Sequence, residues 1–181
     1  MRSALFLDRD GVVNYDSGYT HIWSECLVNR EVINLIKKFR ENAFLIIIIT
    51  NQSGIGRGYY SEQDFHNFMD SMSEYLASLL APIDGYFYCS CNPQKTSCYN
   101  RKPNPGMFYK AFQEFNINPK SSVMIGDKLT DILAAHDADI PNKYLYRSSE
   151  SNLEDNQKPT DYSSILSLWE VQVPENKKEQ I

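Results

Sequence analysis

The sequence predicts an α/β fold in which helices cover both faces of a central parallel sheet. Short apolar runs alternate with segments of helical periodicity, a pattern typical of strand and helix units wound around such a sheet. One run, FLIIIIT at residues 44–50, has no polar alternation and therefore predicts a strand buried on both faces. With 181 residues, 42% of them hydrophobic, the chain can bury one substantial core.

Apolar runs predict the strands, and apolar stripes at helical spacing predict two of the helices. The predicted strands are residues 3–7, 44–50, 85–89, 122–126 and 143–147. The first stripe is Val32, Leu35, Ile36 and Phe39, and the second is Phe65, Phe68, Met69, Met72, Leu76 and Leu79. We expect a single domain over residues 1–175 with no separate cap domain, followed by a polar tail at 176–181 that frays.

Composition and charge argue against several classes of protein. The formal net charge of −5 disfavours a broad surface for nucleic acid. The sequence contains no run of about 18 or more apolar residues, the length needed to span a bilayer. The start, MRSALFLDRD, reaches charged residues too soon to provide the apolar segment of a signal peptide. We therefore expect a cytoplasmic protein with no nucleic-acid or membrane partner. It is expected to be a monomer.

Reactive side chains follow four of the predicted strands. In chain order they are Asp8 and Asp10, Thr50 to Ser53, Arg101 and Lys102 beyond a cysteine-rich loop, and Asp127 and Lys128. Because ligands of open α/β sheets bind beyond the carboxyl ends of the strands, these residues are expected to converge. Carboxylates can hold Mg²⁺, and hydroxyl and ammonium donors can surround a transferring phosphoryl group. The set therefore suits phosphoryl transfer.

Asp8 and Asp10 could divide the chemistry between them. On an extended strand end, side chains two residues apart point the same way, so both could face one substrate. The first can attack phosphorus. The second can protonate the leaving oxygen and then deprotonate the water that splits the acyl phosphate. A lone D-x-D more often forms a turn or caps a helix, so the pair carries this interpretation only together with the other strand ends.

Five motifs occur in a shared order: DRDGVVN, GYTH at 18–21, TNQSGIGRG, RKPNPGM and GDKLTD. Together they resemble the haloacid dehalogenase (HAD) superfamily of phosphatases. Within it they are most similar to the D-glycero-D-manno-heptose 1,7-bisphosphate phosphatases, whose relatives are the histidinol-phosphate phosphatases. The resemblance runs from about residue 5 to about residue 147. It implies a Rossmann-like HAD core.

The resemblance also implies residue roles. Asp8 would be the nucleophile that forms an aspartyl-phosphate, Asp10 the general acid and base, and Thr50 and Lys102 would steady the phosphoryl oxygens. Mg²⁺ would be held by Asp8, Asp127 and the main-chain carbonyl of Asp10. Substrate contacts are implied for Asp16, Ser17, Gly18, Tyr19, Asn51, Gln52, Ser53, Arg101 and Lys128. Asp131 is not included, because an acid one helical turn after Asp127 can equally orient Lys128 or cap the helix.

The cysteine-rich loop departs from the family pattern. These phosphatases usually carry a structural zinc whose ligands read C-x-H, a spacer and C-x-C before RKP. Here Cys89, Cys91 and Cys98 fall on three ligand positions, but Asn100 stands on the fourth. Zn²⁺ prefers four N or S ligands, so Cys26, His21, a water or a partner chain would have to complete the site. The alternative is a loop that has lost its metal and keeps three reduced thiols.

The resemblance favours one reaction. We expect hydrolysis of the 7-phosphate of D-glycero-D-manno-heptose 1,7-bisphosphate, a small phosphorylated sugar, on the route to activated heptose for lipopolysaccharide or other surface glycans. Histidinol-phosphate hydrolysis is the main alternative, because the cysteine loop is short as in that branch. A DNA 3′-phosphatase would use the same chemistry, but the acidic net charge counts against it. A catalytically silent interaction module would require the acids at the strand ends to be idle.

Overall fold

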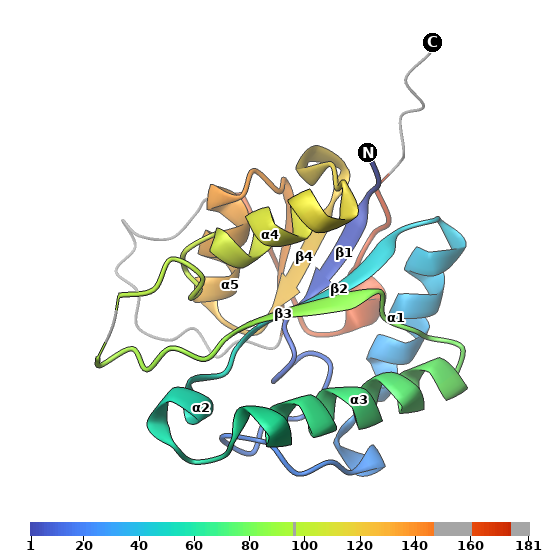
Figure 1. Ribbon diagram of the computed structural model, residues 1–181. Helices are drawn as coiled ribbons and strands as arrows, with labels where there is room; N and C mark the ends of the chain where they lie inside the picture. Colours follow the sequence, from blue (N-terminus) through green and yellow to red (C-terminus); the bar gives the residue numbers. More distant parts are fainter. Residues whose placement is uncertain (96, 147–160, 175–181) are drawn as a thin grey trace.

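The strands form one parallel sheet whose order differs from their order in the chain (Figure 1). The computed structural model describes residues 1–95, 97–146 and 161–174. Within these ranges the strands are β1 (Ala4–Leu7), β2 (Leu45–Asn51), β3 (Gly85–Cys89), β4 (Val123–Gly126), β5 (Asn142–Tyr146) and β6 (Ser163–Ile165). They are ordered β3-β2-β1-β4-β5-β6, and each neighbouring pair is parallel. The predicted α/β class is therefore confirmed.

Helices cover both faces of this sheet. In Figure 1, α1 and α3 lie on one face, and α4 and α5 lie on the other. The α-helices are α1 (Arg30–Glu41), α2 (Ser53–Arg57), α3 (Glu62–Ser78), α4 (Gly106–Phe115) and α5 (Leu129–Asp137). Asn29 caps α1 by accepting from the main-chain N–H of Glu31, and Ser61 caps α3 by accepting from that of Asp64. These two helices, α1 and α3, thus begin where a polar side chain satisfies an N–H that the helix itself leaves unpaired.

Alternate residues of the central strands pack into opposite helical layers. In β1, Leu5 and Leu7 belong to the core cluster that contains the apolar stripes of α1 and α3, whereas Phe6 packs with α4. In β2, all residues from Ile46 to Ile49 are fully buried, as the uninterrupted apolar run predicts for a strand in mid-sheet. The polar residues that follow these strands are left at the carboxyl edge of the sheet.

The predicted strand positions agree with the structure to about one residue. The last predicted strand begins at Asn142 instead of residue 143, and its predicted end, Arg147, lies outside the described residues. β6 is absent from the prediction, because its sequence, SSI, buries only Ile165 and has no apolar run. The predicted frayed tail at 176–181 also lies outside the described residues. No helix in the described ranges has the length and apolar character needed to cross a bilayer.

Candidate active site

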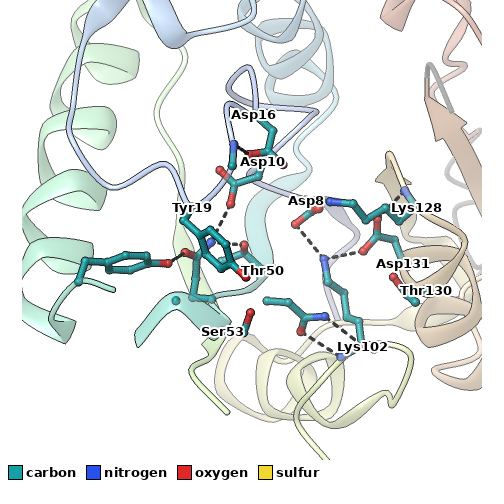
Figure 2. Close-up of a pocket in the computed structure, with 15 residues that line it drawn as sticks. Asp8, Asp10, Asp16, Tyr19, Thr50, Ser53, Lys102, Lys128, Thr130 and Asp131 are labelled. Atoms are coloured by element: carbon teal, nitrogen blue, oxygen red, sulfur yellow. Dashed lines mark hydrogen bonds and ion pairs between the residues drawn. The ribbon is translucent and has the colours of Figure 1, made fainter. Parts of the chain in front are cut away.

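A cavity of about 270 Å³ opens beyond the carboxyl ends of β1, β2 and β4 (Figure 2). The predicted site residues that line it are Asp8, Asp10, Asp16, Gly18, Tyr19, Thr50, Asn51, Gln52, Ser53, Lys102 and Lys128. The structure thus brings together side chains that are far apart in the sequence. Their roles in binding and catalysis remain predictions.

Lys102 joins two buried carboxylates. Its Nζ atom lies 2.8 Å from Asp8 Oδ1 and 2.6 Å from Asp131 Oδ1, and it donates to the main-chain carbonyl of Ile49 at 2.7 Å. Figure 2 marks the two ion pairs with dashed lines. The ammonium therefore has an acceptor for each of its three protons, which a buried cation requires. Asp8 Oδ1 also accepts from the main-chain N–H of Arg9 at 2.8 Å. These contacts hold the Asp8 carboxylate in one orientation.

Asp127 completes a group of three carboxylates. Oxygen atoms of Asp8, Asp127 and Asp131 all lie within 4.8 Å of one another. Gly11 makes room for Asp127: its φ is +91°, and a Cβ atom there would overlap the Asp127 carboxylate. Asp127 Oδ1 is buried and has no hydrogen-bond partner in the described part of the chain. Because Mg²⁺ binds carboxylate oxygens, this donor set fits the predicted ion.

The group carries an excess of negative charge. Burial raises the pKa of Asp8 well above its ordinary value, since the opposing attraction of Lys102 is smaller and Asp131 and Asp127 repel the charged form. Burial likewise raises the pKa of Asp127. Burial on its own lowers the pKa of Lys102, but the carboxylates of Asp131 and Asp8 outweigh it and raise this pKa above its ordinary value. With three acids around one ammonium, a divalent cation would neutralise the surplus.

Asp10 is held by donors on both of its oxygens. The fully buried Arg9 donates to Oδ1 from Nε at 3.0 Å and from Nη2 at 2.8 Å, and Nη2 also reaches Oδ2 at 2.8 Å. Asn14 donates to Oδ1 at 3.0 Å, and Gln52 donates to Oδ2 at 2.8 Å. Asp8 and Asp10 both line the cavity as predicted. However, β1 ends at Leu7, so a turn and not an extended strand brings Asp10 there.

Two predicted substrate residues do not line the cavity. The Ser17 hydroxyl lies 3.2 Å from that of Thr20, within the loop that carries Asp16, Gly18 and Tyr19 to the cavity. Arg101 precedes Lys102 in the chain but is not among the lining residues. Substrate contact by Ser17 and Arg101 therefore remains a prediction that the geometry of the cavity does not support directly.

The chain is similar to known phosphatases. Residues 99–168 match the model of the HAD-hydrolase-like family. A D-glycero-β-D-manno-heptose-1,7-bisphosphate 7-phosphatase of Pasteurella multocida is 37% identical over 167 residues, which cover 90% of this chain and 91% of that protein. The chain belongs to the heptose-bisphosphatase family of HAD hydrolases.

Other relatives in the heptose-bisphosphatase family differ in the sugar anomer that their names give. A D-glycero-α-D-manno-heptose-1,7-bisphosphate 7-phosphatase of Burkholderia mallei is 41% identical over 148 residues, 78% of each chain. Among solved structures, a D,D-heptose 1,7-bisphosphate phosphatase from B. bronchiseptica, complexed with magnesium and phosphate, matches with a TM-score of 0.81. It is 26% identical, and the match covers 92% of this chain and 93% of that chain.

Four residues that line the cavity of this heptose-bisphosphatase family member are absent from the predicted set: Gly54, Tyr60, Thr130 and Asp131. Asp131 has a sequence signal, because it lies one helical turn after Asp127. Its Oδ2 atom accepts from the main-chain N–H of Lys128 at 3.0 Å, so it does cap α5 as its spacing suggests. Its ion pair with Lys102 depends on a segment distant in sequence, and no local pattern indicates it.

The three cysteines of this family member converge as their positions predict. Their Sγ atoms lie within 4.8 Å of one another, and those of Cys89 and Cys98 are 3.4 Å apart. Burial raises the pKa of Cys89 to about 12. Burial also works against the thiolate of Cys98, yet hydrogen bonds from Cys91 and Cys89 outweigh it and lower the pKa of Cys98.

The fourth zinc ligand is not found among the described residues. No further His, Cys, Asp or Glu side chain there joins the three thiols. His21 stacks on Tyr60 with ring centroids 4.8 Å apart, and Cys26 is exposed beside a different cavity. Three thiols that could bind zinc therefore lie together, but a closed structural zinc site takes four ligands, and the described residues do not supply the fourth.

Mg²⁺ is expected to stabilise this heptose-bisphosphatase family member more strongly as pH rises from about 5 to about 8. Because burial raises the folded-state pKa of Asp8 and Asp127, protons compete with the cation at acidic pH. In the metal-free chain, protonation of these two acids favours the folded state. This contribution to stability is lost as pH rises through their raised folded-state pKa values. Thermal melts with and without Mg²⁺ measure the difference, which should reach about 5 °C at saturating Mg²⁺ and the highest pH.

The matched control is Asp127→Asn, which keeps the shape of the side chain and removes one charge. This variant should lose most of the Mg²⁺ effect and its pH dependence. A Mg²⁺-induced shift in Tm that is the same at every pH would contradict the assignment of the ion to these carboxylates.

Proposed function

We propose that this chain is a Mg²⁺-dependent phosphatase that removes the 7-phosphate of D-glycero-D-manno-heptose 1,7-bisphosphate through an aspartyl-phosphate intermediate. The observation that carries the chemistry is the buried group of Asp8, Lys102 and Asp131 beside the clamped Asp10 in one cavity. The relatives in the heptose-bisphosphatase family support the substrate. The product would enter the synthesis of activated heptose for lipopolysaccharide or other surface glycans.

In the first step, an Asp8 carboxylate oxygen attacks the phosphorus of the 7-phosphate. The bond between phosphorus and the sugar oxygen breaks, and Asp10 gives its proton to that oxygen. Lys102 and Thr50 supply fixed donors to the phosphoryl oxygens. Thr50 is suited to this task, because its Oγ1 atom accepts from Gln52 Nε2 at 2.8 Å and its own proton stays available for the phosphoryl group.

In the second step, Asp10 is a carboxylate and takes a proton from water. The water oxygen attacks the phosphorus of the aspartyl-phosphate, the bond to Asp8 breaks, and inorganic phosphate leaves. Asp8 returns as a carboxylate, and Asp10 again carries a proton. In its carboxylate form, Asp10 is held in place by Arg9, Asn14 and Gln52.

Asp8, Asp127 and the main-chain carbonyl of Asp10 would hold Mg²⁺. When bound, the ion supplies positive charge that lets a phosphate dianion approach carboxylates and stabilises the transferring group. The cavity needs such a charge, because its lining acids Asp8, Asp10, Asp16 and Asp131 outnumber the two lining lysines.

The loop with Asp16, Gly18 and Tyr19 would contact the sugar. Tyr19 is 46% exposed, and its ring meets that of Tyr59 edge-on with centroids 4.7 Å apart. This contact joins the loop to the segment after α2 and holds one phenol ring at the mouth of the cavity. Carboxylate and amide groups beside an aromatic ring suit the hydroxyls and the C–H faces of a sugar.

The cysteine loop would have a structural role only. A zinc ion held by three thiolates would need a fourth ligand from water or another chain, and no step of the reaction uses this ion. The loop contacts the site through backbone: Gln52 donates from its main-chain N–H to the Cys89 carbonyl at 2.7 Å. Measuring the zinc content of purified protein distinguishes a loop that binds zinc from a loop with three free thiols.

The expected result is that phosphate release with Mg²⁺ is much faster from the heptose bisphosphate than from histidinol phosphate at equal concentration. Both anomers of the heptose are compared, since the relatives carry either anomer in their names. The remaining sugar should keep its 1-phosphate, which phosphorus NMR identifies.

Asp8→Asn protein provides the blank for contaminating phosphatases. A preference for histidinol phosphate would retain the mechanism and replace the substrate. Equal release from wild type and the Asp8→Asn variant would contradict the proposed function altogether.

A further inference from the structure

Tyr60 has a buried hydroxyl next to the catalytic machinery. It follows α2, is 7% exposed, and its Oη atom donates to Gln52 Oε1 at 2.6 Å. Burial raises the pKa of Tyr60 to about 12, so the phenol keeps its proton at neutral pH. The hydroxyl is therefore a permanent donor aimed at one amide oxygen.

The Gln52 amide uses its two ends differently. Its oxygen accepts from Tyr60, while its nitrogen donates both protons, to Asp10 Oδ2 and to Thr50 Oγ1, each at 2.8 Å. A half-turn of the amide would replace the donor on Asp10 with an oxygen that repels the carboxylate. The Tyr60 proton opposes this half-turn, because it needs an acceptor in the place where the amide oxygen now lies.

The position of the Tyr60 ring is determined by its neighbours. His21 stacks on it with an interplanar angle of 8°. A Cβ atom at Gly54 would overlap the ring, so the glycine allows the ring to approach the backbone of α2. The phenol is thus held between the loop that carries His21 and the helix that follows Gln52.

We propose that Tyr60 is a positioning residue: its hydroxyl fixes the orientation of the Gln52 amide, and the amide in turn aims the Asp10 carboxyl group at the leaving oxygen. This inference rests on the proposed function and extends it to a residue that does not touch the reacting atoms. It concerns the part of the reaction that needs a proton, because Asp10 supplies that proton in the first step.

The test is Tyr60→Phe, which keeps the ring and removes one oxygen. For the heptose bisphosphate, whose alkoxide leaving group needs a proton, kcat/KM should fall about tenfold. For p-nitrophenyl phosphate, whose leaving group departs without a proton, kcat/KM should fall less than about twofold. The matched control is Tyr109→Phe: this ring on α4 is 44% exposed and does not line the cavity, so both values should stay unchanged.

A double-mutant cycle tests whether Tyr60 acts through Gln52. In a Gln52→Ala background, Tyr60→Phe should have no further effect on kcat/KM for the heptose bisphosphate. An equal loss with both substrates would indicate a merely structural role and overturn the inference, as would additive losses or no loss. A wild-type chain that turns over neither substrate would contradict the proposed function itself, and this inference with it.

Discussion

Asp8→Asn is expected to reduce turnover by about 10⁴-fold or more while the chain stays folded. The amide matches the carboxylate in shape but cannot attack phosphorus. It also removes one of three crowded acids, so the metal-free variant should be at least as stable as the wild type, because burial and the repulsion from Asp131 and Asp127 no longer oppose a charge there. A substitution that raises stability and abolishes activity is typical of a residue that is needed for catalysis and not for folding.

Four measurements check this expectation. Phosphate release gives the loss of turnover, calorimetry with Mg²⁺ shows that the substrate still binds, and thermal melts report stability. Intact mass after an acid quench should show a phosphoryl adduct in the wild type and none in the variant. Asp139→Asn is the control, because Asp139 is exposed and forms an ion pair with surface Lys120. Turnover near the wild-type level in Asp8→Asn would exclude Asp8 as the nucleophile.

Lys102→Met is expected to damage both stability and catalysis. The ammonium is 2% exposed and neutralises Asp8 and Asp131 together, so its removal leaves two buried carboxylates without their cation. Breaking a buried pair in this way costs about 3 to 5 kcal/mol. Turnover should fall about 10²-fold to 10³-fold, since a fixed donor to the phosphoryl oxygens is lost as well.

The pH dependence identifies the cause of the lost stability. If it comes from the unpaired acids, it should shrink at acidic pH, where Asp8 with its raised pKa takes up a proton. Urea unfolding at two pH values and phosphate release measure the two effects. Lys120→Met, which breaks the exposed pair with Asp139, is the control and should change neither. A Lys102→Met chain with wild-type stability at neutral pH would show that the buried pair is not needed for folding.

The parallel sheet was predictable from local pattern. FLIIIIT has no polar position because helices cover both faces of β2, and this burial is visible in the composition of the run itself. The sixth strand was not predictable. β6 buries one residue, Ile165, and depends on its pairing with β5, a contact that local sequence does not encode.

Within the site, the sequence predicts the residues that belong to motifs. It misses residues whose role depends on contacts in the folded structure. Asp8, Asp10, Thr50, Lys102 and Asp127 stand at strand ends or in recognisable motifs, so their meeting at one sheet edge follows from topology. The interactions that each site residue makes depend on the side chains packed around it. Asp131 looks like a helix cap until Lys102 is seen 2.6 Å away.

The sequence by itself determined the fold class, the family and the acids that meet at the sheet edge, because apolar periodicity and short motifs are local properties of the chain. Only the tertiary structure decided how those acids are held. The buried bridge through Lys102, the clamp of Arg9 on Asp10 and the bond from Tyr60 to Gln52 depend on directions and distances of about 3 Å between side chains, which hydrogen bonds require and no one-dimensional pattern records.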